Sequence, residues 1–500
     1  MKAIDDLFFC PSISISKIPH VSLMEFIEAK DLKAPSREQL ERAQKIIEIC
    51  QRWRQNRETV AGELPEHLLA QANWSEDAPN SIYDLYNKVA NGDSETLRLF
   101  RFYTQPFSGV DLSEWRRPVA KTPVRRESDI VANQIRHLAE AEMVSRIRYP
   151  QITAGLPASW AVRTPEVPGE VGWLMDGHIV SPDILRYQLQ FQNLVESGFL
   201  PTPEEGPAEI AEIGAGYGGL AYFILSAFPN VRYSIIDLPE SILFSALYLG
   251  MAFPHLKMAF EGVDDATTLA QANVVFCPNF TFPNSVTATG KYNLVMNIGS
   301  FAEMAESQVD AYGQWASTHL LTVEGKSIGA LYEVNVEHLL QGSQKSVRTT
   351  LKEHFQRRRR VVPLSSLDQE SKWQYYWTEE TLHPSIIERQ KNRAVAIKQA
   401  ETPRVLFQDS SHVLWQFRGV YVAHVGDRPF DLLNGDAFER GRLVRDERLL
   451  LSPEKNDIEH LIQRALKRQN RTWIRRVMNA IVGRDRSADT RAWLRDQLCV

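Results

Sequence analysis

The 500-residue sequence is poor in the features that mark several specialised classes of protein. Its four cysteines, Cys10, Cys50, Cys277 and Cys499, lie far apart and show no metal-ligand spacing. No apolar run is long enough to cross a bilayer, and a net charge of −5 gives no general attraction to nucleic acid. The first ten residues contain two acids and no long apolar core, unlike a signal peptide. We therefore expect a reduced, cytoplasmic protein without a transmembrane segment, a nucleic-acid partner or a metal site.

Length and composition predict a globular protein of more than one domain. Apolar residues make up 43% of the chain and charged residues 24%, and 500 residues exceed the size of one ordinary domain. The stretch 165–172 is rich in helix and strand breakers and marks a candidate boundary. We expect a helical N-terminal region at 1–165, a central α/β domain at 166–430 and a helical, basic extension at 431–500.

The N-terminal region shows helical patterns but no residues that point to chemistry. Ser36 and Gln39 form a capping-box pattern, followed by apolar residues at helical spacing. Further helices are expected over 93–102 and 128–149. Substrate enclosure, homo-oligomer formation and plain packing all remain open as the role of this region.

The most informative stretch is a glycine-rich segment between a predicted strand and a predicted helix. Residues 210–213 form a short apolar run, and residues 220–228 read as a helix. Gly214, Gly216 and Gly218 allow a sharp turn and leave no side chain between the backbone and a ligand. The free amides at the start of the helix would face that ligand.

A second strand, residues 231–237, ends in Asp237 about 20 residues after the glycines, where related sheets hold a ribose. A carboxylate can accept hydrogen bonds from both hydroxyls of a ribose diol. The two features together predict a site for a nucleoside-bearing cofactor.

Two kinds of cofactor fit the glycines. Gly214, Gly216 and Gly219 satisfy G-x-G-x-x-G, which is typical of dinucleotide sites. Glu212, however, lies two residues before the first glycine, and its carboxylate would repel a pyrophosphate. The pattern E-x-G-x-G-x-G therefore favours a cofactor without phosphates, and a structural turn without a ligand is the third reading.

The rest of the central region alternates strands and helices, which predicts an α/β fold with a doubly wound, mostly parallel sheet. Strands are expected at 273–278, 292–297 and 327–334, and residues 255–272 are expected to be irregular or an insertion. Two late strands, 413–417 and 420–424, would complete the sheet as a hairpin. Ligands of such sheets bind at the carboxyl ends of the strands. Several polar residues fall at such ends: Asp237, Asn279, Asn297 and Glu333.

Four other segments carry open alternatives. Ser181-Pro182-Asp183 predicts the start of a helix that ends near Gly198, with His178 in the preceding loop. The run 357–360 of four arginines is either a solvated face or a patch for an anionic substrate. The aromatic segment 373–377 either stacks on sugars or belongs to the core. The basic segment after residue 457 packs on the protein itself or contacts a membrane surface or an acidic partner.

The motif that begins at Glu212 resembles motif I of class I S-adenosylmethionine-dependent methyltransferases. Within that class, three segments resemble bacterial sugar O-methyltransferases: 212–221, 228–239 and 297–304. The resemblance covers roughly residues 170–340. It implies a Rossmann-like methyltransferase fold, S-adenosylmethionine as the cofactor and methyl transfer to a hydroxyl of a sugar or a glycosylated small molecule.

The resemblance also implies roles for particular residues. Eight would bind the cofactor: Glu212, Gly214, Gly216, Gly218, Asp237, Leu238, Pro278 and Asn279. Glu303 is the first candidate for the general base that a sugar hydroxyl needs, His178 is the second, and Asn297 would orient the acceptor. Asp264 and Asp265 could be recruited for magnesium, but adjacent acids in a loop are usually solvated, and no metal is expected.

Alternatives to a sugar methyltransferase remain at this stage. The acceptor could be a carboxylate or hydroxyl of a non-sugar natural product, and the arginine run would favour an anionic one. The chain could also be a non-catalytic scaffold that binds the cofactor. A dehydrogenase is the alternative that the glycines alone allow.

Overall fold

The computed structural model describes residues 34–65, 82–104, 162–200, 207–360 and 374–400, with short gaps inside these ranges. It also describes strands at 26–27 and between 404 and 431, and the residues 68–69, 145, 149, 153 and 160. The helix expected over 128–149 and the basic segment after residue 457 lie outside the described residues, apart from two single positions of the former.

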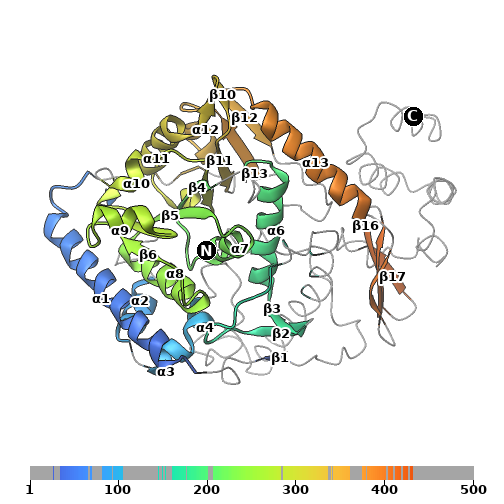
Figure 1. Cartoon of the computed structure of the whole chain (residues 1–500), viewed down its shortest axis with the longest axis horizontal. Helices are drawn as coiled ribbons and strands as arrows, with labels where there is room; N and C mark the ends of the chain where they lie inside the picture. The colour runs from blue at the N-terminus through green and yellow to red at the C-terminus, as the bar shows by residue number, and fades with distance from the viewer. Residues whose placement is uncertain are drawn as a thin grey trace.

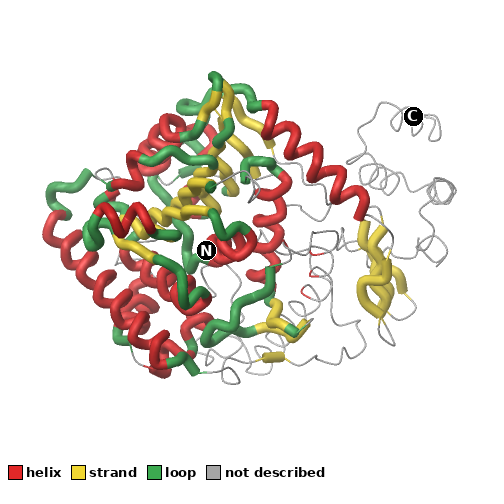
Figure 2. The backbone as a smooth tube through the Cα atoms, viewed as in Figure 1, coloured by secondary structure: helices red, strands yellow, loops and turns green. Residues whose placement is uncertain are grey.

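An eight-stranded sheet forms the centre of the molecule (Figures 1 and 2). Its strand order is β12-β13-β11-β8-β4-β5-β7-β6, and β13 alone runs antiparallel to its neighbours. The strands are β4 (Ala208–Ile213), β5 (Val231–Asp237), β6 (Met258–Phe260), β7 (Val274–Pro278), β8 (Leu294–Ile298), β11 (Ala330–Val334), β12 (Arg357–Arg360) and β13 (Gln374–Thr378). The predicted α/β fold with a mostly parallel sheet is confirmed.

Helices cover both faces of this sheet, as a doubly wound fold requires. One apolar cluster joins the sheet to α6, α7 and α8, and a second joins its other face to α11 and α12. The helices are α6 (Pro182–Glu196), α7 (Gly219–Ala227), α8 (Pro239–Ala252), α9 (Ala266–Gln271), α10 (Val286–Thr289), α11 (Glu306–His319), α12 (Val347–Leu351) and α13 (Pro384–Ala400).

Strand β4 lies where the strand order reverses. The chain leaves β4 toward β5 on one side and returns to pair β8 on its other side. In open α/β sheets a crevice forms outside the carboxyl ends of the strands at such a point. The glycine-rich segment that follows β4 therefore lies at the edge where ligands bind.

Two expectations about the sheet are wrong. Residues 255–272 contain β6 and α9 rather than irregular structure, because a short apolar run gives β6 an edge position beside β7. Strands β15 (His412–Phe417) and β16 (Val420–Val425) do not complete the main sheet. They pair with β14 (Arg404–Gln408) and β17 (Arg428–Asp431) in a separate antiparallel sheet.

The edge of the main sheet is formed instead by β12 and β13. The arginine run is therefore the edge strand β12 of the main sheet. In β13, Tyr376 and Trp377 are buried, which supports the core alternative for these two aromatic residues. Strand pairing determines which segment completes the main sheet: β13 pairs with β11 and β12. Amino-acid composition does not reveal this pairing.

Helix α1 (Arg37–Val60) has the predicted capping box and lies alongside α8 (Figure 1). The indole Nε1 of Trp53 donates to the Glu261 backbone oxygen at 3.1 Å. Arg57 makes a bidentate ion pair with the fully buried Glu240, with distances of 2.9 and 2.6 Å. These contacts join the N-terminal region to the end of β6 and to α8, the helix that follows Asp237.

The remaining elements are short. The single helix expected over 93–102 is two helices, α3 (Ser94–Arg98) and α4 (Phe100–Thr104), and α2 (Ile82–Ala90) precedes them. A small antiparallel sheet contains β1 (Phe26–Ile27), β2 (Gly172–Met175) and β3 (His178–Val180). A hairpin joins β9 (Thr322–Val323) to β10 (Lys326–Ser327), and a 3₁₀ helix, η11 (Ser300–Glu303), follows β8.

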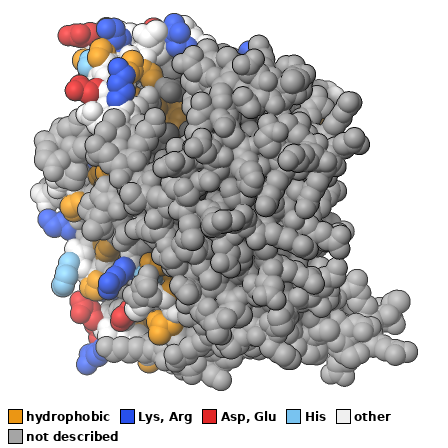
Figure 3. Space-filling model, turned by 90° about the vertical axis from the view of Figure 1, so that its right-hand side faces the viewer, with side chains coloured by type: hydrophobic (Ala, Val, Ile, Leu, Met, Phe, Trp, Pro, Cys, Tyr) orange, Lys and Arg blue, Asp and Glu red, His pale blue; other side chains and the backbone are white. Residues whose placement is uncertain are grey.

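Where described residues reach the surface, at the left margin of Figure 3, acidic, basic and apolar side chains are interspersed. Among the helices that the structure describes, none combines the length and apolar character that a membrane span requires.

We expect Arg57→Ala to destabilise the protein by about 3–5 kcal/mol, because it leaves the buried Glu240 carboxylate without its bidentate partner. Urea unfolding followed by circular dichroism measures the change. Arg37→Ala is the matched control, since it removes an exposed arginine of the same helix that pairs with Glu41. Equal unfolding midpoints for the two variants would contradict the importance of this ion pair.

Candidate functional site

The glycine-rich segment after β4 makes an open bend. Gly214, Gly216 and Gly218 have φ angles of 74°, 57° and 86°, which favour glycine. A Cβ atom on Gly214 would also collide with the Ser300 side chain, which lies against the bend. Gly214 and Gly216 are partly exposed while their neighbours are buried, so the backbone at these two positions is accessible to a ligand.

The two acids that motivated the cofactor prediction lie on the same face of neighbouring strands. Glu212 in β4 is level with Ile235 in β5, and Asp237 follows Ile235 by two residues. Alternate residues of a strand point to the same face, so both carboxylates lie on the face that α6 and α7 cover. The structure thus brings Glu212, the bend and Asp237 together at one edge of the sheet.

Glu212 is buried, and its Oε2 accepts a hydrogen bond of 2.7 Å from the Tyr233 hydroxyl. Burial raises the pKa of Glu212 to about 7; the Tyr233 hydrogen bond opposes this rise and the charge of Asp237 adds to it. Asp237 is half-buried, and its Oδ1 accepts a 2.8 Å hydrogen bond from the Leu238 amide. Burial raises the pKa of Asp237 to about 7 as well, against the effect of the Leu238 and Gly216 amides.

The next strand end contains Pro278 and Asn279. Pro278 is level with Asp237, and the backbone N–H of Asn279 donates to the Asp237 backbone oxygen at 2.8 Å. The Asn279 side chain is buried and donates from Nδ2 to the Leu68 backbone oxygen at 2.7 Å. Its Oδ1 is buried and has no hydrogen-bond partner among the described residues. An orphaned acceptor beside Asp237 fits a ligand with a donor at this end.

Asn297, at the end of β8, has no hydrogen-bonding capacity left. Its Nδ2 donates to the Ile213 backbone oxygen at 3.0 Å and to Ser300 Oγ at 2.6 Å. Its Oδ1 accepts from the Phe301 amide and from Asn335 Nδ2, both at 3.0 Å. Two donors and two lone pairs are the whole capacity of an amide side chain. In this conformation Asn297 holds the end of β8 against the bend.

The two candidates for a general base lie in different parts of the fold. Glu303 is half-buried at the end of η11, three residues after Ser300, and therefore belongs to the loop that follows β8. His178 begins β3 in the small sheet, with its ring 5.1 Å from that of Tyr149. No described contact connects His178 to the bend. Both roles remain predictions, and the position of Glu303 favours it over His178.

Asp264 and Asp265 have structural contacts. Asp264 Oδ2 accepts from the Phe260 amide at 2.7 Å, and Asp265 caps α9 by accepting from the Thr268 amide at 2.7 Å. Within the part of the chain that the structure describes, no group of three or more metal-ligating side chains is found.

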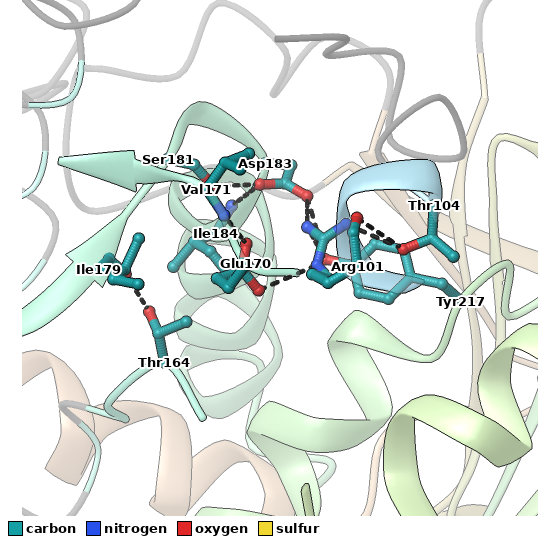
Figure 4. A network of polar contacts seen from close by, with 10 residues as sticks. All are labelled: Arg101, Thr104, Thr164, Glu170, Val171, Ile179, Ser181, Asp183, Ile184 and Tyr217. Atoms are coloured by element: carbon teal, nitrogen blue, oxygen red, sulfur yellow. Dashed lines mark hydrogen bonds and ion pairs between the residues drawn. The ribbon is translucent and has the colours of Figure 1, made fainter. Parts of the chain in front are cut away.

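A buried charged network that no sequence pattern indicates lies behind the bend (Figure 4). Arg101 of α4 is fully buried and forms ion pairs with Asp183 of α6 and with Glu170, the latter at 3.0 Å. Its guanidinium lies 4.0 Å from the ring centroid of Tyr217, whose hydroxyl is 3.0 Å from Arg101 Nη2. Tyr217 lies between Gly216 and Gly218, so this network holds the back of the bend.

The charges of the network are unbalanced when both acids are ionised. Burial alone would lower the pKa of Arg101, but Asp183 and Glu170 raise it well above its usual value. Burial raises the pKa of Glu170 to about 7, although Arg101 opposes the rise. Ser181 begins α6 as predicted, but its hydroxyl donates to Asp183 instead of capping the helix. No local sequence signal indicates Arg101, because its partners lie about 70 to 120 positions further along the chain.

A comparison with protein-family models finds no match, and neither does one with curated proteins. Several of the similar solved structures carry the name of a methyltransferase, all at low sequence identity and low TM-score. Human methyltransferase-like protein 13, in complex with SAH, is 17% identical; the match covers 45% of this chain and 96% of that chain, with a TM-score of 0.25. Precorrin-6y C5,15-methyltransferase from Geobacter metallireducens is 15% identical; the match covers 38% of this chain and 85% of that chain, with a TM-score of 0.23.

For the pyocyanin biosynthetic protein PhzM the identity is 12% and the TM-score is 0.24. The match covers 39% of this chain and 56% of that chain, so it spans little more than half of PhzM. Values this low do not bear on the function of the present chain.

The raised pKa of Glu212 predicts a pH-dependent stability. The folded protein keeps a proton that the unfolded chain releases above about pH 4, so this group lowers the free energy of unfolding as the pH rises from about 4 to about 7. We expect Glu212→Gln to be more stable than the wild type by about 1–3 kcal/mol at pH 8 and nearly equal to it at pH 5. Urea unfolding at both pH values measures this, with the exposed Glu41→Gln as control. A difference that does not change with pH would refute the prediction.

Proposed function

We propose that this protein is an S-adenosylmethionine-dependent O-methyltransferase whose acceptor is a hydroxyl of a sugar or of a glycosylated small molecule. The observation that carries the proposal is the pair of acids on one face of adjacent strands, on either side of an accessible glycine bend. A nucleoside with a sulfonium side chain has a diol for Asp237 and carries positive charge toward Glu212. A dinucleotide would place its phosphates beside the same acids.

Residues of this chain offer suitable partners to the ribose, the base and the amino-acid end of this cofactor. Asp237 retains acceptor capacity for a ribose diol, because a carboxylate has about four lone-pair sites and the Leu238 amide, the Gly216 amide and the Ser241 side chain do not use all of them. Asn279 Oδ1 is an orphaned acceptor one strand further along, suited to an amino group of the base. Leu238 is half-exposed beside Asp237 and offers an apolar contact to the base. Gly214 and Gly216 leave their backbone open to the amino-acid end.

Methyl transfer to an alcohol then requires two things of the protein. The acceptor oxygen must be held in line with the methyl group, and its proton must be removed. Glu303, in the loop after β8, is our candidate for the group that takes the proton. Asn297 contributes indirectly, because its hydrogen bonds to Ile213 and Ser300 hold the loop against the bend. The sugar acceptor rests on the sequence resemblance alone.

Asp237→Asn should weaken binding of S-adenosylhomocysteine roughly 10- to 100-fold, because hydrogen bonds to the ribose lose a charged acceptor. Isothermal titration calorimetry measures the dissociation constant. Asp310→Asn is the matched control, since it removes one carboxylate from α11, which lies on the other face of the sheet. Absence of binding to the wild-type protein, or equal affinities for wild type and Asp237→Asn, would count against the proposed cofactor.

Glu303→Gln should lower kcat by roughly 100- to 10,000-fold, because the amide cannot accept the acceptor's proton. The affinity for S-adenosylhomocysteine should stay unchanged. Mass spectrometry of candidate sugars incubated with S-adenosylmethionine detects the methylated product and supplies the assay for kcat. An unchanged kcat would exclude Glu303 as the base and leave His178 as the next candidate.

A further inference from the structure

Gln190, in the middle of α6, has an unusual environment for an amide side chain. It is 1% exposed, and neither its Oε1 nor its Nε2 has a hydrogen-bond partner among the described residues. By contrast, Gln188 on the same helix is 2% exposed and donates from Nε2 to the Trp160 backbone oxygen at 3.2 Å. Leaving an amide buried without partners destabilises a folded protein, so its presence calls for an explanation.

The helical repeat places Gln190 on the face of α6 that meets the glycine bend. Residues three or four apart lie on one face of a helix, so Gln190 shares its face with Asp183 and Tyr187. Asp183 reaches Tyr217 in the bend, where the Tyr217 hydroxyl lies 3.2 Å from Asp183 Oδ2. The Tyr187 ring covers Gly219 so closely that a Cβ atom there would collide with it. Gln190 is the next residue along this face.

The strand register shows how far along the strands, toward their carboxyl ends, Gln190 lies. The Tyr376 hydroxyl donates to the backbone oxygen of Asn193, the residue one turn after Gln190. Tyr376 is level with Tyr332, Met296 and Glu212 across four neighbouring strands. Because α6 begins at the bend and continues past this row, Gln190 lies about 4.5 Å nearer than Asn193 to the bend.

That height is close to the carboxyl ends of β8 and β11. Ile298 and Val334 follow the row of Met296 and Tyr332 by two residues, and they point to the same face as that row. Val334 belongs to the apolar cluster that includes Tyr187, and Ile298 packs against that cluster.

The Tyr376 contact also gives the side, because β13 lies beyond β8 and β11 from β4, whereas β5 and β7 lie on the other side of β4. Gln190, one turn from Asn193, therefore lies on the β8 side of the bend, opposite the side where Asp237 ends β5 and Asn279 follows β7.

We propose that the Gln190 amide binds the amino-acid end of the cofactor. This inference rests on the proposed function: if Asp237 holds the ribose and Asn279 the base, the methionyl portion extends from the bend toward β8, where Gln190 lies. An α-amino group and an α-carboxylate together offer donors and acceptors, and an amide provides both kinds of partner. Gln190 is then a specificity-determining residue that is strained without ligand and satisfied with it.

The test compares two ligands that differ only at this end. S-adenosylhomocysteine carries the amino-acid portion, whereas 5′-methylthioadenosine lacks it. In Gln190→Leu the affinity for S-adenosylhomocysteine should fall roughly 10- to 100-fold, while that for 5′-methylthioadenosine should change less than about twofold. The same variant without ligand should have a melting temperature at least equal to that of the wild type, because an unpartnered buried amide has been removed.

Gln188→Leu is the matched control, with the same substitution on the opposite face of α6. It breaks an existing hydrogen bond and should lower the melting temperature while leaving both affinities unchanged. Equal weakening of both ligands by Gln190→Leu, or no weakening of S-adenosylhomocysteine, would overturn the inference. Failure of the wild-type protein to bind either ligand would instead overturn the proposed function on which it rests.

Discussion

The buried guanidinium of Arg101 is the interaction on which the arrangement of the site depends most. It joins three parts of the chain that are distant in sequence: α4, the start of α6 and the glycine bend. An arginine this deeply buried is stable only with paired carboxylates, and Asp183 and Glu170 supply them. Because Tyr217 packs on the guanidinium, the back of the bend is held and its front remains open.

The N-terminal helices take part in the same arrangement at two further points. Arg57 pairs with Glu240, which lies three residues after Asp237. The Leu68 backbone oxygen accepts a hydrogen bond from the side-chain amide of Asn279 and so orients it. All three loops that would meet the cofactor therefore have a contact from residues before 105. The division into three regions stays a prediction, but these contacts make residues 34–104 part of the framework of the site.

The cofactor side of the site could be predicted from sequence to a large extent, because its signals are local. The bend needs glycines where φ is positive, and a strand that ends in an acid about 20 residues later is visible as a pattern. The catalytic side depends on contacts between distant segments, which the sequence does not show. The sequence shows only that Asn297 lies at a strand end, whereas the structure shows that all its hydrogen bonds are internal. Glu303 and His178 stay predictions.

Gln190 illustrates the limit of pattern reading. No local pattern distinguishes Gln190 from the other glutamines of α6, and most buried amides find partners, so only the structure identifies this exception. The sequence by itself determined the alternation of strands and helices, the bend and its two acids, because these follow from backbone preferences and apolar spacing. Only the tertiary structure decided which side chains close the site, since burial and pairing depend on segments that meet after folding.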